Sequence, residues 1–221
     1  MFAATPLPPE KLLRALAGSA GVFACVVFVF HLIEFAWCAG VRALRRRLGE
    51  QAAASRFPGH APMAPWAALG LAFRHSLWIV PTTLAVSCAF TWAAGRLGFK
   101  LPQQELVEWL AGDFYSPSVK AAIVLYAMIS APVLEELIFR RFVFRLFFRY
   151  LPAWAAVGLS AVIFAAVHWN AAVFVPIAFL GACFAVIYLK TGRLLAPMLC
   201  HCVFNASNVV LIMLFPELVL S

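Results

Sequence analysis

The sequence predicts an all-α fold, a polytopic transmembrane helix bundle of about six spans. Of its 221 residues, 65% are hydrophobic and only 12% are charged. Globular chains average about 45–50% apolar and about 25% charged residues, so part of this apolar surface has to face lipid. The apolar residues also gather in runs of about 20, the length that crosses a hydrocarbon core of about 30 Å as a helix. These observations exclude a soluble enzyme, a disordered tail and a fibre.

The expected spans follow these apolar runs in order, and proline or glycine stands at many of their junctions. We expect spans at residues 15–39, 76–95, 118–138, 153–170, 172–189 and 195–215. Each has to be a helix, because a helix satisfies its backbone polar groups internally within the hydrocarbon region. Residues 48–65 are predicted to form a cytoplasmic linker, and residues 96–117 an external loop or an interfacial helix. The chain is therefore divided into an N-terminal part with two spans, residues 1–117, and a core of four spans, residues 118–215.

The basic residues predict the orientation of the bundle. The net charge is +8, but the 17 Lys and Arg residues lie mostly at the ends of apolar runs and not in one patch, as nucleic-acid binding would require. Twelve of the 17 follow the first, third and fifth spans or lie in the first loop: Arg42, Arg45, Arg46, Arg47, Arg56, Arg74, Arg140, Arg141, Arg145, Arg149, Lys190 and Arg193. The positive-inside rule makes these places cytoplasmic, so both termini are expected outside.

Two adjacent carboxylates lie at the end of the third apolar run, in the segment Glu-Glu-Leu-Ile-Phe-Arg at residues 135–140. An ionisable side chain inside a span costs about 2.5–3.5 kcal/mol and therefore needs a reason. Glu136 and Arg140 are one helical turn apart and can pair, which leaves Glu135 on another face without a local partner. A free carboxylate beside a neutralised one can serve as a base. The alternative is a Glu/Arg cluster at the membrane edge with no chemical role.

Two further polar pairs lie in apolar runs. His168 follows Phe164 by one turn late in the expected fourth span, and His201 and Asn205 share one face near the start of the sixth. A single histidine in an apolar helix is more often a packing residue, and His201 and Asn205 could bond a neighbouring helix or hold an oxyanion. At 1.5 Å per residue, Glu135, His168 and His201 lie about 15–20, 24 and 12 Å from the cytoplasmic boundary. Bringing His168 level with the others requires a kink or a shorter embedded start of its span.

The three motifs together resemble those of the CPBP family of intramembrane proteases. They are Glu-Glu-x-x-x-Arg at 135–140, Phe-x-x-x-His at 164–168 and His-x-x-x-Asn at 201–205, in this order on consecutive apolar helices. The family comprises CAAX prenyl endopeptidases and bacteriocin-processing or immunity-type bacterial relatives. The resemblance covers about residues 118–210, and the order and spacing of all three motifs make it specific. One departure is Arg141, where the family often has glycine.

The resemblance implies an intramembrane endopeptidase and a role for each motif residue. Glu135 and His168 would activate a water, and His201 and Asn205 would stabilise the tetrahedral oxyanion. Glu136 and Arg140 would support them. Peptide hydrolysis does need a base for water and donors for the oxyanion. We expect no cofactor, with zinc as the alternative.

Two alternatives stay open. Glu135, His168 and His201 could ligate zinc, which accepts three protein ligands and a water, although the chain has no His-Glu-x-x-His motif. A non-proteolytic transporter or partner-binding protein is the other alternative, with His31 and Glu34 in a proton relay. Transporters usually have related halves or paired broken helices, and the sequence contains neither.

The expected partners are the lipid bilayer and a membrane-associated protein or peptide substrate, with no nucleic acid. The expected location is the bacterial inner (cytoplasmic) membrane, as a multi-pass protein. Prenylated CAAX tails and other membrane peptides both remain candidate substrates.

Overall fold

The computed structural model describes residues 8–14, 17, 18, 28, 61–99, 101, 109, 110, 112 and 115–215, and every regular element among them is a helix. The predicted all-α class is thus confirmed. The helices are α2 (Pro65–Arg96), α4 (Pro117–Leu125), α5 (Ala131–Glu136), α6 (Arg145–Tyr150), α7 (Ala153–Ala166), α8 (Phe174–Thr191) and α9 (Leu195–Leu214). They are joined by the π-helices η1 (Tyr126–Ser130) and η2 (Leu137–Phe144) and the 3₁₀ turn η3 (Ala171–Val173).

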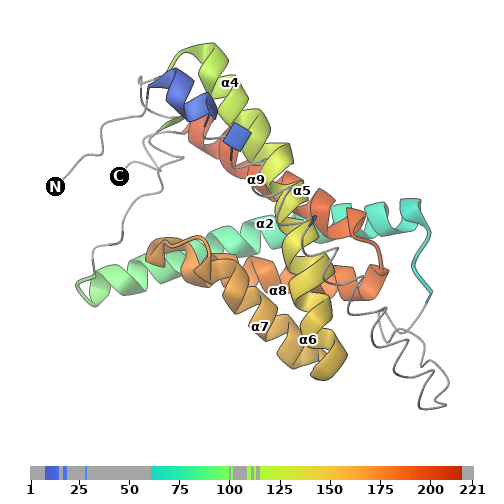
Figure 1. Ribbon diagram of the computed structural model, residues 1–221. Coiled ribbons are helices and arrows are strands. Elements are labelled where there is room, and N and C mark those ends of the chain that lie inside the picture. The colour runs from blue at the N-terminus through green and yellow to red at the C-terminus, as the bar shows by residue number, and fades with distance from the viewer. Residues whose placement is uncertain are drawn as a thin grey trace, which may run out of the picture.

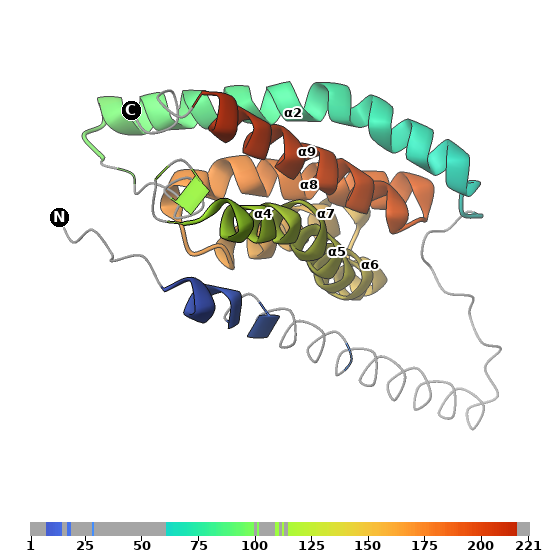
Figure 2. The ribbon, with the colours of Figure 1, turned by 90° about the horizontal axis from the view of Figure 1, so that it is seen from above.

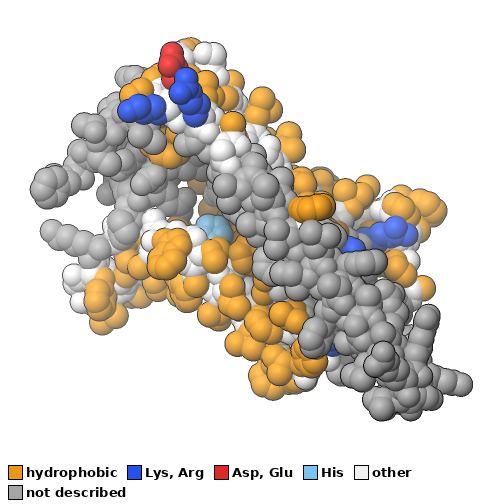
Figure 3. Space-filling model, viewed as in Figure 1, with side chains coloured by type: hydrophobic (Ala, Val, Ile, Leu, Met, Phe, Trp, Pro, Cys, Tyr) orange, Lys and Arg blue, Asp and Glu red, His pale blue; other side chains and the backbone are white. Residues whose placement is uncertain are grey.

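Four helices of the described part are long and apolar enough to cross a membrane. They are Pro65–Arg96, Pro117–Tyr150, Ala171–Thr191 and Leu195–Leu214. Hydrophobic side chains cover most of the described surface in Figure 3, and Lys and Arg gather towards its ends. The predicted first span and most of the predicted external loop lie outside the described residues, as do His31 and Glu34. These long apolar helices make the chain an integral membrane protein.

The helix α2 begins 11 residues before the predicted second span. Pro65 starts it, and proline suits the first helical position because its missing N–H would have no partner there. Ala68 and Ala72 on this helix are buried against α8 and α9, and small side chains of this kind let helices approach closely. The thiol of Cys200 on α9 donates to the carbonyl of Ala72 at 3.1 Å. Figure 2 shows α9 between α2 and the helix that contains α4 to α6.

One continuous helix runs from Pro117 to Tyr150 and contains the two π-helical stretches. Figure 1 shows it as a long diagonal from α4 to α6. Pro132 does not break this helix, because the chain stays helical through it, directly after η1. A π-turn changes the hydrogen-bond pattern next to a proline that has no N–H to donate. Glu135 and Glu136 therefore lie at the end of α5, between two π segments.

The helix α7 is shorter than its predicted span, because it ends at Ala166 and not at residue 170. Its 14 residues span about 21 Å, less than a hydrocarbon core of about 30 Å. The chain leaves the helix in a turn in which Trp169 has φ 49° and the Asn170 side chain accepts from the Ala172 amide. The helix therefore ends at this turn, which contains His168 and Asn170.

The hairpin of η2–α6 and α7 determines which residues are level with one another. Phe139 precedes Leu151 by 12 residues and Phe164 follows Pro152 by 12, and their rings touch edge to face at 5.0 Å. Glu135 and His168 are each 16 residues from the same turn. Counted from this turn, Glu135 and His168 are therefore level with one another along the hairpin.

Candidate active site

Glu136 and Arg140 form the predicted ion pair. The Arg140 Nε lies 3.1 Å from the Glu136 Oε2, and both residues are buried, at 1% and 0% exposure. The guanidinium also donates through Nη2 to the Gly181 carbonyl at 3.0 Å, and its Cζ lies 4.5 Å from the Phe164 ring centre. A carboxylate, a carbonyl and an aromatic face thus compensate the cost of burying this cation.

His201 links the first and third motifs. Its Nδ1 lies 3.0 Å from the Glu136 Oε1 and donates to it, because a carboxylate oxygen only accepts. The opposite nitrogen, Nε2, faces the Oε2 of Glu135 at 3.7 Å. The Phe184 ring lies against the imidazole at 4.8 Å between centres. His201 is therefore fixed in its ring orientation, between two carboxylates.

Glu135 is held differently from Glu136. Its Oε2 is buried and has no hydrogen-bond partner in the described part of the chain, and 3.7 Å to the imidazole is too long for a hydrogen bond. A buried polar oxygen without a partner is unfavourable. The Glu136 Oε2 and the Arg140 Nε also lack a hydrogen bond among the described residues, but they lie 3.1 Å apart as an ion pair. The Glu135 Oε2 has only the imidazole at 3.7 Å, and a water or a polar substrate group would satisfy it.

His168 lies just beyond the end of α7, not within it as predicted. Its Nδ1 is 2.7 Å from the Phe164 carbonyl and donates to it, which leaves Nε2 with the lone pair. The residue is exposed. The Phe164 ring lies 5.0 Å from the His168 ring and 5.9 Å from that of His201. Phe164 thus joins the second motif to the third.

Asn205 follows His201 by one turn of α9, as predicted, and its amide Nδ2 donates to the Ala127 carbonyl on η1 at 2.7 Å. An amide nitrogen has two hydrogens, so this bond also fixes the direction of the second one. The structure therefore gathers Glu135, Glu136 and His201 by direct contact, and it orients Asn205 from the neighbouring π-helix.

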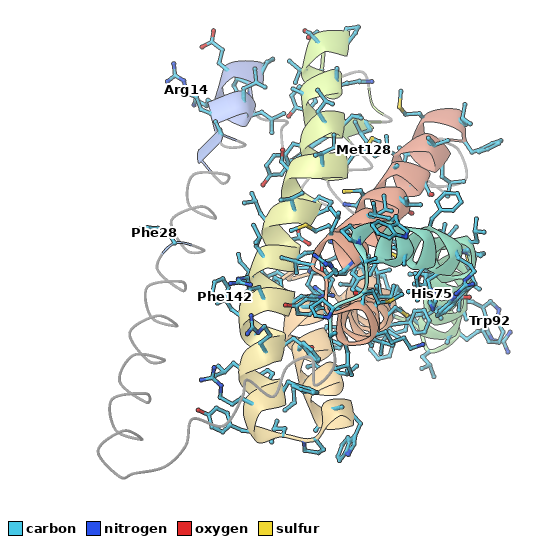
Figure 4. All side chains as sticks on the ribbon, turned by 90° about the vertical axis from the view of Figure 1, so that its right-hand side faces the viewer. Arg14, Phe28, His75, Trp92, Met128 and Phe142 are labelled. Atoms are coloured by element: carbon cyan, nitrogen blue, oxygen red, sulfur yellow. The ribbon has the colours of Figure 1, made fainter. Side chains whose placement is uncertain are left out.

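In the part of the chain that the structure describes, no group of three or more His, Cys, Asp or Glu side chains is arranged to hold a metal ion. Metal analysis of the purified protein tests the zinc alternative directly. His75 on α2 bonds its own helix, with Nδ1 2.8 Å from the Leu71 carbonyl. Figure 4 shows it across the bundle from the α4–α6 helix.

Sequence reasoning missed three contributors to the site. Gly181 binds Arg140 through its carbonyl, Phe184 packs on His201, and the Ala127 carbonyl holds Asn205. Gly181 has a sequence signal, because an isolated glycine inside an apolar helix often has a packing reason. The other two are a phenylalanine among 21 and a backbone group, so the sequence does not distinguish them.

The bundle and the site define a membrane protein with a buried cluster of carboxylates, histidine and arginine among its helices. Residues 117–207 match the Rce1-like family of type II CAAX prenyl endopeptidases, and this range contains all three motifs. The chain is also similar to the membrane-embedded CAAX protease MroQ of Staphylococcus aureus (strain USA300), with 30% identity over 128 residues. Residues 117–207, which contain the three motifs, are thus similar to this family, and both matches support a CPBP family intramembrane protease.

The similarity to MroQ covers 51% of this chain and 51% of the relative, so the chain matches about half the length of that protein. No solved structure matches the chain significantly.

Proposed function

We propose that this protein is an intramembrane endopeptidase that hydrolyses a peptide bond of a membrane-associated substrate. The observation that carries the proposal is the unpaired, buried Oε2 of Glu135, which lies 3.7 Å from His201 within a bundle of apolar helices. A buried carboxylate can act as a general base on a water molecule, and water is the nucleophile in peptide hydrolysis. The family match over residues 117–207 supports the same activity.

In the proposed reaction, Glu135 accepts a proton from water while the water oxygen bonds to the substrate carbonyl carbon. The lone pair on Nε2 of His168 orients that water, since Nδ1 is committed to the Phe164 carbonyl. The proton then passes to the amide nitrogen as the carbon–nitrogen bond breaks, and the products are a carboxylate and an amine. A positioned general base of this kind contributes about 10²–10⁴-fold to the rate.

The oxyanion of the tetrahedral intermediate would be held by His201 and Asn205. Because His201 Nδ1 already donates to Glu136, its Nε2 can donate only when the ring is protonated. A protonated imidazole together with Arg140 balances the two carboxylates, so the site is neutral in this state. The second hydrogen of Asn205 Nδ2 would complete the oxyanion site.

The proposed location is the bacterial cytoplasmic membrane, with a membrane-associated protein or peptide as substrate. The grouping of basic residues and the bacterial relative support this assignment. Either a prenylated CAAX tail or another membrane peptide would suit a site among apolar helices.

The test is a map of new protein N-termini in membranes that contain the wild type, Glu135→Gln or Glu10→Gln. Glu10 is an exposed glutamate in a distant helical turn and is the matched control for the same substitution. The proposal predicts termini that appear with the wild type and the control and disappear with Glu135→Gln. The same termini in all three samples would refute it.

A further inference from the structure

We propose that Gly181 on α8 is a positioning residue of this site. Its missing side chain makes room for the Phe164 ring, and its carbonyl fixes Arg140, so that one residue sets the place of both histidine rings. The inference rests on the proposed function for its consequence in catalysis, but the contact itself can be tested without a substrate.

The first observation is steric. A Cβ at position 181 would lie 2.9 Å from the Cδ1 of Phe164 and 3.3 Å from the Cα of Ala161, both on α7. Backbone atoms of a packed helix cannot move aside cheaply, so the ring would have to shift. Phe164 is 1% exposed, so its ring is enclosed by the protein. Gly181 is thus the position at which α7 and α8 come close enough to hold the ring.

The second observation is what the Phe164 ring touches. Its centre lies 5.0 Å from the His168 ring, 5.9 Å from the His201 ring and 4.5 Å from the Arg140 guanidinium. At these distances the rings interact as aromatic pairs and the guanidinium as a cation–π partner, and the strength of both interactions depends on where the Phe164 ring lies. A displaced Phe164 would therefore change the surroundings of both histidines.

The third observation is the backbone of Gly181, which joins the site by a separate route. Its carbonyl accepts from Arg140 at 3.0 Å, and Arg140 in turn holds Glu136, which orients His201. A glycine retained for helix packing alone would affect the stability of the α7–α8 pair and leave the histidines unchanged. A positioning glycine would affect the histidines first.

The substrate-free test compares Gly181→Ala with Gly158→Ala. Gly158 is a helical glycine on α7 where an added Cβ meets nothing within 4 Å, so it is the matched control. The readout is the NMR signals of the imidazole Cε1–H groups of His168 and His201, which sense the Phe164 ring current. We expect both signals to move in Gly181→Ala and neither to move in Gly158→Ala. Unchanged histidine signals in Gly181→Ala would overturn the inference.

The activity test is the split between kcat and KM on a cleaved substrate. A misplacement of 1 Å can cost about 100-fold in rate, so kcat should fall by at least about tenfold in Gly181→Ala with KM little changed. Gly158→Ala should keep the wild-type values. A wild-type kcat in a folded Gly181→Ala variant would contradict a positioning role.

A double variant separates the ring contact from general damage. Phe164→Leu removes the ring, so adding Gly181→Ala to it should cost little more, and the two losses should not add. Additive losses would overturn the inference. If Gly181→Ala folds poorly, restored folding in the double variant supports the steric contact, and continued misfolding refutes it.

The two hypotheses fail in different ways. If the histidine signals move in Gly181→Ala but the wild type cleaves nothing, the positioning contact stands and the proposed function fails. If the wild type cleaves and Gly181→Ala matches it in signals and in kcat, the proposed function stands and the inference about Gly181 fails.

Discussion

The imidazole of His201 on α9 lies 3.0 Å from the carboxylate of Glu136 on α5, 65 positions away in the chain. Both side chains are buried, at 4% and 0% exposure. This contact gives Glu136 two partners, Arg140 on its own helix and His201 on another. In the proposed mechanism Glu136 is therefore the supporting carboxylate, since Arg140 and His201 both contact it, and Glu135 is the base.

The two glutamates should respond differently to the same substitution. Glu136→Gln removes the charge that Arg140 and His201 contact, and breaking a buried ion pair costs about 3–5 kcal/mol. We expect a clearly lower melting temperature and yield. Glu135→Gln should leave the melting temperature close to the wild type, because no ion pair within hydrogen-bond distance is lost. A thermal-shift assay with the reverse order would show that the roles are exchanged.

The backbone conformation of Trp169 should lower the stability of the folded protein relative to glycine at this position. Its φ of 49° lies in the left-handed region, which costs a non-glycine residue about 1–3 kcal/mol, and its side chain is 94% exposed. Trp169→Gly should therefore melt at a higher temperature than Trp169→Ala. Trp154 in the first turn of α7, at 79% exposure, is the control, because there alanine should be the more stable choice. The same order at both positions would contradict the strain.

Much of the fold could be predicted, because run length and apolarity are local properties. The expected spans 172–189 and 195–215 agree with the observed helices within two residues at each end. The start of α2 was missed, because Arg74 and His75 interrupt the apolar sequence while the helix continues through them to Pro65. The end of α7 was also missed, because a backbone turn at Trp169 ends the helix before the apolar run that continues from Ala171.

The site was predictable where the chemistry is local. Glu136 and Arg140 are one turn apart, and their pairing follows from helix geometry alone. The contact of His201 with Glu136, and that of Arg140 with Gly181, join helices that are far apart in the sequence. Helical periodicity gives each residue a face but does not say which face of another helix it meets. These contacts therefore needed the structure.

The orientation of the chain is open to a direct test. Twelve of the 17 basic residues lie at places predicted to be cytoplasmic, and such an excess normally sets topology. Reporter fusions after Leu48, Arg149 and Thr191 should read cytoplasmic, and fusions after Gln103 and at Ser221 should read external. A cytoplasmic reading at Ser221 would contradict the arrangement with six spans.

Zinc dependence can be separated from a glutamate base by metal analysis. We expect purified protein to contain far less than one equivalent of zinc and to keep its activity after prolonged chelation. A zinc site would instead lose metal when His168 or His201 becomes alanine, because each would remove one of three ligands. A near-equimolar metal whose removal and return switch cleavage off and on would end the glutamate-base account.

The central claim is that Glu135 activates the water, and the most direct measurement is kcat of purified Glu135→Gln in proteoliposomes. The substrate is the membrane segment identified by the map of new N-termini, and Glu10→Gln is the control. The account predicts a loss of about 10²–10⁴-fold in kcat for Glu135→Gln, whose melting temperature should stay close to that of the wild type. Glu10→Gln should keep full activity. A folded Glu135→Gln protein that cleaves at the wild-type rate would contradict the account.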